Sequence, residues 1–259
     1  MSQRKFAIVT GASSGIGYEL AKIAAGQGYD LLVAADEPLV DASAAFENMG
    51  VEVRSVEADL ATEEGVSRLL QAAGDRPVDL LLANAGHGLG HAFLEQEPRQ
   101  WRHVIDTNVT GTLLLVQPVA RKMAARGEGR ILFTGSIAGH IAGAFQAVYN
   151  GSKAFIDSFA AALRNELKGS GVTVTCLKPG ATDTDFFERA DMTDTKVGTA
   201  KKDDPADVAR TGWDAMMKGE AAVVHGLMNK AQVLASGVLP EKVTAEMHRK
   251  LAEPGTAKE

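Results

Sequence analysis

The stretch FAIVTGASSGIG at residues 6–17 joins a short apolar run to a cluster of glycines. An apolar strand that leads through glycines into a helix is the usual setting of a loop that holds a pyrophosphate. Glycine lets the backbone approach a ligand closely, and a helix N-terminus presents unpaired N–H groups to negative charge. A tight turn that only packs the helix against the strand would use the same glycines, so the rest of the chain must decide between these interpretations.

The same strand–helix alternation repeats along the whole chain. Its apolar runs are nearly continuous rather than alternating, as expected for strands covered on both faces. Repeated strand–helix–strand units give a parallel sheet with right-handed crossovers. The sequence therefore predicts an α/β, doubly wound Rossmann-type fold, with about seven parallel strands and helices on both faces. The predicted strands are Phe6–Thr10, Leu31–Ala35, Val51–Val56, Leu80–Ala83, Arg130–Thr134, Val172–Leu177 and Ala221–Val224.

No feature of the sequence divides the chain: it has no linker rich in Pro, Gly or Ser, no change of composition and no internal repeat. We therefore expect one domain over residues 1–259. Residues 181–204 have no periodic pattern and are predicted to form a lid-like loop, and Glu253–Glu259 to form a frayed tail. The predicted helices include Ile16–Ala25, Glu63–Ala73, Trp101–Ala125, Ala147–Leu167 and one that starts at Asp204-Pro205.

The composition excludes several classes of protein. Apolar residues make up 45% and charged residues 23%, the balance of an ordinary globular protein. A net charge of −6 argues against partners such as nucleic acid or an anionic membrane. The single Cys176 excludes an internal disulfide, and no apolar stretch is long enough to span a membrane, so a cytoplasmic location is expected. No metal site is expected, because His87 and His91 share a glycine loop with no cysteine nearby.

Asp36 and Glu37 follow the second predicted strand. A carboxylate about 20 residues beyond a glycine loop can accept hydrogen bonds from the adenosine ribose hydroxyls, and it repels a 2′-phosphate at short range. No Arg or Lys lies between Tyr29 and Arg54 to attract such a phosphate. The pattern favours NAD over NADP; a solvated carboxylate that caps the next helix is the alternative interpretation.

Tyr149 and Lys153 lie four positions apart, which places the phenol and the ammonium on one face of a predicted helix. A free tyrosine titrates near ~10. A neighbouring ammonium, together with the positive nicotinamide of an oxidised cofactor, lowers that pKa, so Tyr149 could exchange a proton with a substrate. Ser136 follows the fifth predicted strand, where its hydroxyl could hold a substrate oxygen. No Gly-x-Ser-x-Gly turn surrounds it, so a hydrolase nucleophile is not expected. Asn108 sits beside Thr and Gly inside a predicted helix, a poor local fit that is typical of a functional position.

The T-G-x-x-x-G-x-G spacing, together with Asn108, Ser136, Tyr149 and Lys153, resembles the short-chain dehydrogenase/reductase family over roughly residues 6–180. The resemblance implies that Tyr149 is the acid/base. It implies that Lys153 lowers the pKa of Tyr149 and binds the nicotinamide ribose. Ser136 would orient the substrate oxygen, and Asn108 would support a water relay to Lys153.

The resemblance also implies a dinucleotide site at the strand ends. Asp59-Leu60 would recognise the adenine, Asn84-Ala85-Gly86 would close the adenosine side, and residues 179–184 would hold the nicotinamide carboxamide. The family often has Val or Ile where this chain has Thr182. The implied cofactor-binding residues are Gly11, Ser13, Ser14, Gly15, Ile16, Gly17, Asp36, Asp59, Leu60, Asn84, Ala85, Gly86, Tyr149, Lys153, Pro179, Gly180, Thr182 and Thr184.

The predicted function is hydride transfer between NAD and a small secondary alcohol or ketone. One alternative is an NADPH-dependent carbonyl or 3-oxoacyl reductase, which would need Asp36 turned away from the ribose. Another is a dinucleotide-binding regulator without turnover, against which the complete tetrad argues. By resemblance, a homodimer or homotetramer is expected, joined through the helices Trp101–Ala125 and Ala147–Leu167.

Overall fold

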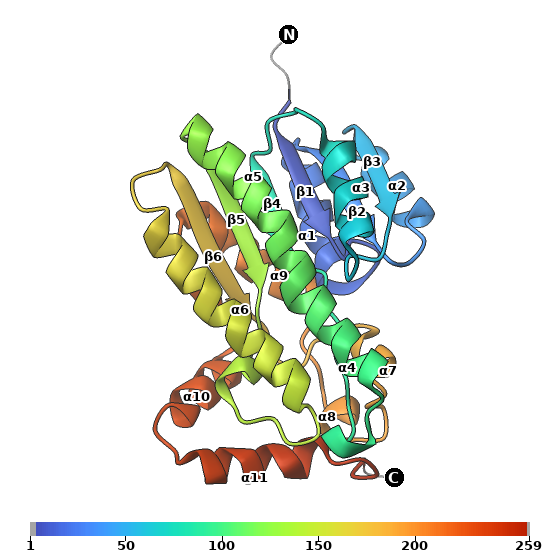
Figure 1. Ribbon diagram of the computed structural model, residues 1–259, viewed down its shortest axis with the longest axis vertical. Coiled ribbons are helices and arrows are strands. Elements are labelled where there is room, and N and C mark those ends of the chain that lie inside the picture. The colour runs from blue at the N-terminus through green and yellow to red at the C-terminus, as the bar shows by residue number, and fades with distance from the viewer. Residues whose placement is uncertain (1–3, 258–259) are drawn as a thin grey trace.

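Figure 1 shows a central sheet between two layers of helices in the computed structural model, which describes residues 4–257. All neighbouring strands pair in parallel, in the order β3-β2-β1-β4-β5-β6-β7. This order confirms the doubly wound Rossmann-type fold, and each strand lies within two residues of its predicted bounds. The strands are β1 Phe6–Thr10, β2 Asp30–Ala35, β3 Val53–Glu57, β4 Leu80–Ala83, β5 Gly129–Thr134, β6 Val172–Lys178 and β7 Ala222–Val224.

Helices follow the strands in alternation, and five of them were not predicted: α2 Val40–Glu47, α7 Phe186–Arg189, α8 Lys196–Thr199, α10 Leu227–Ser236 and α11 Glu241–Ala252. A 3₁₀ turn at Ile137–His140 follows β5. The helices are α1 Gly15–Gly26, α2 Val40–Glu47, α3 Glu63–Ala73, α4 Pro98–Ile105, α5 Thr112–Arg126, α6 Ala147–Glu166, α7 Phe186–Arg189, α8 Lys196–Thr199, α9 Pro205–Lys218, α10 Leu227–Ser236 and α11 Glu241–Ala252.

The two faces of the sheet carry separate hydrophobic clusters. Phe6 and Ile8 of β1 belong to the cluster with α3, α5 and α6, whereas Ala7 and Val9 belong to the cluster with α1, α2 and α9. Successive strand residues point to opposite faces, so a strand covered on both sides needs apolar residues at every position. The residues of β1, β2 and β4 are accordingly all buried.

The predicted helix Trp101–Ala125 is interrupted, so that prediction was partly wrong. A π-helical segment, Asp106–Gly111, separates α4 from α5 while the axis continues through it (Figure 1). A methyl group on Gly111 would lie 1.9 Å from the carbonyl oxygen of Leu60, so the segment packs directly on the turn after β3. π-segments of this kind occur mostly at functional sites, and this one contains Asn108.

The C-terminal part departs furthest from the sequence-based expectation. Residues 181–204 contain α7 and α8, and α10 and α11 lie beyond the carboxyl ends of the strands (Figure 1). The described part of the tail is not frayed: Gly255 N–H donates to Asp194 Oδ2 at 2.7 Å, and Ala257 N–H donates to the Asp194 carbonyl at 2.8 Å. The prediction missed these contacts because Asp194 lies far away in the sequence.

Within residues 4–257, no helix has the length and apolar character needed to cross a membrane.

Candidate active site

A cleft of about 330 Å³ opens at the carboxyl ends of the strands. In a doubly wound sheet, ligands bind at this edge where the strand order reverses, which here is between β1 and β4. The cleft is lined by every predicted catalytic and cofactor-binding residue except Gly17 and Asn108. These two residues are buried and do not line the cleft.

The glycine loop turns tightly into α1 because three of its positions have no room for a side chain. Gly11 and Gly15 have φ angles of +66° and +57°, a conformation that favours glycine. A methyl group on Gly17 would lie 1.9 Å from the Gly11 carbonyl oxygen, so Gly17 holds the helix against the loop. The side chain of Ser14, the N-cap of α1, makes no capping hydrogen bond, which leaves first-turn N–H groups available to an anion. This arrangement fits the pyrophosphate of a dinucleotide.

Asn84 joins the ends of three strands beneath the cleft. Its backbone N–H donates to Thr10 Oγ1 at 3.0 Å, and its side-chain amide donates to the Thr10 carbonyl at 3.1 Å. Its Oδ1 accepts from Thr134 Oγ1 at 3.0 Å. Asn84 therefore braces β1, β4 and β5, a role that its position after a strand did not indicate.

Asn108 holds the loop after β4 against α6. Its Oδ1 accepts from the His87 N–H at 2.8 Å, and its Nδ2 donates to the His87 carbonyl and to Ser152 Oγ, each at 2.9 Å. A methyl group on Gly86 would lie 3.1 Å from Asn108 Oδ1 and 3.4 Å from Lys153 Nζ. The side chains of Asn108 and Lys153 thus meet the loop at the same point, although Asn108 itself does not line the cleft.

Tyr149 and Lys153 are buried at the start of α6, with 8% and 6% of each residue exposed. Burial raises the pKa of Tyr149 to about 12, partly offset by a hydrogen bond with Ser136. Burial thus opposes the lowering of the pKa that Lys153 and an oxidised nicotinamide are expected to cause. Lys153 Nζ lies 5.8 Å from the centroid of the Tyr149 ring and donates to the Thr134 carbonyl at 2.8 Å.

Lys153 gives the site a pH-dependent effect on stability. Burial lowers its pKa from 10.5 to about 8, so between these pH values the unfolded chain binds more protons than the folded one. The free energy of unfolding should therefore rise with pH from about 8 to 10.5, relative to a Lys153→Met variant that has no such titration. Urea denaturation of both proteins at pH 7, 8, 9 and 10 measures this difference. Two parallel stability curves would contradict the prediction.

The 181–204 segment lies directly on the glycine loop and on the start of α6. A methyl group on Gly15 would lie 2.6 Å from Thr184 Cγ2. The rings of Phe186 and Tyr149 are 5.1 Å apart between centroids. Deeper in the segment, Met192 is fully buried, and its sulfur accepts a hydrogen bond from Gln146 Nε2 at 2.9 Å. The segment therefore covers both the glycine loop and the Tyr149 phenol.

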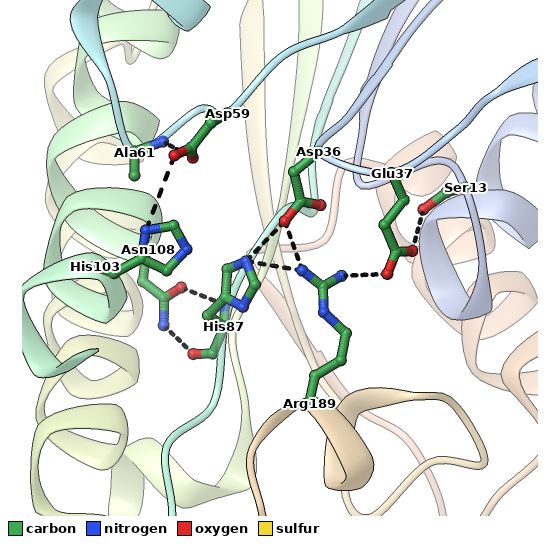
Figure 2. Close-up of polar contacts among 9 residues, drawn as sticks. All are labelled: Ser13, Asp36, Glu37, Asp59, Ala61, His87, His103, Asn108 and Arg189. Atoms are coloured by element: carbon green, nitrogen blue, oxygen red, sulfur yellow. Dashed lines mark hydrogen bonds and ion pairs between the residues drawn. The ribbon is translucent and has the colours of Figure 1, made fainter. Parts of the chain in front are cut away.

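Figure 2 shows a charged cluster beside the end of β2 that the sequence analysis missed. Arg189 of α7 donates to Asp36 Oδ2 at 2.5 Å, and His87 Nε2 lies 3.1 Å from the same oxygen. Hydrogen bonds with His87 and Arg189 hold the pKa of Asp36 well below its usual range, despite partial burial. Local sequence carried no signal for this pair, because Arg189 and Asp36 are 153 positions apart.

The C-terminal helices close the opposite end of the cleft, which sequence reasoning also missed. Asn229 and Gln232 of α10 line it, as do His248 and Leu251 of α11. His248 Nδ1 lies 3.0 Å from the Ala144 carbonyl oxygen, and this contact ties α11 to the loop before α6.

The profile of the family described as "short chain dehydrogenase" matches residues 5–195, well over half of the chain. This chain belongs to the short-chain dehydrogenase family. An uncharacterized oxidoreductase of Staphylococcus saprophyticus is 33% identical over 221 residues, which cover 83% of this chain and 92% of that protein.

Solved structures of short-chain dehydrogenases share the fold. One from Sphingobium yanoikuyae, in complex with NADPH, has a TM-score of 0.81 at 24% identity and covers 92% of this chain and 97% of its own. One from Burkholderia phymatum, in complex with NAD, has a TM-score of 0.80 at 25% identity. The match covers 90% of this chain and 92% of that one. As a short-chain dehydrogenase, the protein is an oxidoreductase.

Proposed function

We propose that this short-chain dehydrogenase transfers hydride between NAD and a small secondary alcohol or its ketone, with Tyr149 as the acid/base. One observation carries the proposal: Tyr149, Lys153 and Ser136 line the same cleft as the glycine loop. Asp36 lines the adenosine end of that cleft, and its carboxylate supports a preference for NAD. The apolar Phe186 suits a moderately apolar substrate.

Each residue of the tetrad has a separate task in this proposal. A bound nicotinamide would supply the carbon that gives or takes hydride and, when oxidised, a positive charge near the phenol. Ser136 would hold the substrate oxygen while charge develops on it. Tyr149 would take the hydroxyl proton during oxidation and return it to the carbonyl oxygen during reduction. Burial favours the neutral phenol, which is the form that donates a proton in the reducing direction.

Lys153 and Asn108 would support this proton transfer. A charged Lys153 would hydrogen-bond the nicotinamide ribose and favour the phenolate form of Tyr149. Asn108 lies next to Lys153 across Gly86, which supports its proposed part in a water relay to Lys153.

Titration of the protein with NADH and with NADPH, followed by fluorescence, tests the proposal. We expect tighter binding of NADH, and turnover of a secondary alcohol with NAD. Asp36→Asn should reduce the preference, since it removes the charge that repels a 2′-phosphate. Asp75→Asn, at an exposed carboxylate away from the cleft, is the matched control. Tighter binding of NADPH would overturn the NAD assignment, and binding of neither cofactor would overturn the proposed activity.

An NADPH-dependent carbonyl or 3-oxoacyl reductase is the second candidate, and one observation favours it. Asp36 is already paired with Arg189. A cation at this place would favour binding of the 2′-phosphate of NADP. If the protein saturates with cofactor but turns over no alcohol or ketone, that result would instead favour a dinucleotide-binding regulator.

We also propose that residues 1–259 work as one domain, with the 181–204 segment as its lid. A homodimer or homotetramer would form through α4, α5 and α6. Partly exposed apolar side chains on these helices support this assignment: Ile105, Leu114 and Phe155.

A further inference from the structure

Arg189 forms the centre of a charged cluster that joins the 181–204 segment to the end of β2 (Figure 2). Its Nη2 donates to Asp36 Oδ2 at 2.5 Å, and its Nη1 lies 3.4 Å from Glu37 Oε1. Glu37 also accepts from Ser13 Oγ of the glycine loop, at 3.3 Å. The guanidinium therefore contacts both carboxylates that follow β2.

The contacts leave half of the Asp36 carboxylate open. Arg189 and His87 both meet Oδ2, whereas Oδ1 has no hydrogen-bond partner among the residues that the structure describes. Asp36 can therefore keep its contact with Arg189 while Oδ1 accepts from a ribose hydroxyl. Asp36 and Arg189 each have 32% of the side chain exposed, and both line the cleft. A ligand can reach both of them.

The charge near the ribose position thus differs from what the β2 sequence indicates. Locally the sequence supplies two carboxylates and no cation, which predicts strong repulsion of a 2′-phosphate. The fold adds Arg189 from the distant 181–204 segment. A guanidinium pairs well with phosphate oxygens, and its fork offers donors beyond those used by the two carboxylates.

We propose that Arg189 is a cofactor-specificity residue: it offsets the repulsion from Asp36 and Glu37 and would pair with a 2′-phosphate on the adenosine ribose. The inference rests on the proposed dinucleotide binding and deepens it. Arg189 narrows the preference for NAD over NADP, and the 181–204 segment thereby contributes to recognition at the adenosine end of the cleft.

The test is the ratio of dissociation constants, Kd for NADPH over Kd for NADH, in the full-length protein. Arg189→Met should raise this ratio by about tenfold, because two carboxylates then face the 2′-phosphate without a counter-charge. Arg189→Lys keeps a cation and should stay closer to the wild-type ratio. Lys201→Met is the matched control: it removes one exposed positive charge from the same segment and should leave the ratio unchanged.

Each outcome separates the possible roles of Arg189. If Arg189→Met weakens both cofactors by the same factor, the residue only holds the segment closed, and the specificity role is wrong. An unchanged ratio, or a ratio that Lys201→Met shifts equally, also overturns the inference. If the wild-type protein binds neither cofactor, the proposed function fails, and that result is distinct from an unchanged ratio in a protein that binds NADH.

Discussion

Tyr149→Phe should lower turnover by about 10²–10⁴-fold while it leaves NADH affinity within a few-fold of wild type. The substitution removes one oxygen, the atom that would exchange the proton with substrate. The ring itself should stay in place, because it is buried and packs against Phe186 with centroids 5.1 Å apart. In the proposed binding mode, the glycine loop and residues at the strand ends hold most of the cofactor, and this change does not touch them.

Tyr29→Phe is the control for this prediction. Tyr29 is as buried as Tyr149, at 7% against 8% exposed, but it belongs to the cluster on the other face of the sheet and packs edge-on against Trp213. Its variant should keep wild-type turnover. Steady-state rates and NADH titrations of both variants provide the measurement. Wild-type turnover in Tyr149→Phe would remove Tyr149 from the proposed mechanism.

Gly17→Ala should weaken cofactor binding at least tenfold and lower the free energy of unfolding by about 1–3 kcal/mol. The added methyl group would lie 1.9 Å from the Gly11 carbonyl oxygen and 2.5 Å from Asn84 Nδ2. The backbone oxygen cannot rotate away, so α1 and the glycine loop must separate. That movement displaces the N–H groups available to a pyrophosphate and strains the Asn84 contacts that brace the strand ends.

Gly151→Ala is the matched glycine substitution. Gly151 lies in α6 between Tyr149 and Lys153, and a methyl group there would meet nothing within 4 Å. The change should stabilise the helix by about 0.5–1 kcal/mol, because alanine loses less backbone entropy than glycine on folding. Urea denaturation and NADH titration of both variants test the pair. Equal stability and affinity in Gly17→Ala and wild type would contradict the tight packing of the glycine loop.

Most of the fold could be predicted because its signals are local. The strands between two layers of helices, such as β1 and β4, are buried at every position, so they read as continuous apolar runs. The π segment shows the limit of such reasoning. The sequence indicated that Asn108 fits a helix poorly, but the packing of Gly111 against Leu60 became visible only in the structure. The unpredicted α10 and α11 are largely exposed: no residue of α10 is buried, and only Thr244 and Ala252 of α11 are.

Most residues predicted for the site line one cleft, but the charges around them could not be predicted from the sequence. The spacing of four on a helix and the order of motifs at the strand ends can both be read from the sequence. They were sufficient to predict that Tyr149, Lys153 and Ser136 lie in one cleft. Ionisation depends on surroundings drawn from the whole chain. Burial raises the pKa of Tyr149 and so opposes the lowering expected from Lys153 and an oxidised nicotinamide. The contact between Arg189 and Asp36 joins residues 153 positions apart, and only the path of the 181–204 segment across the cleft decides that charge pair.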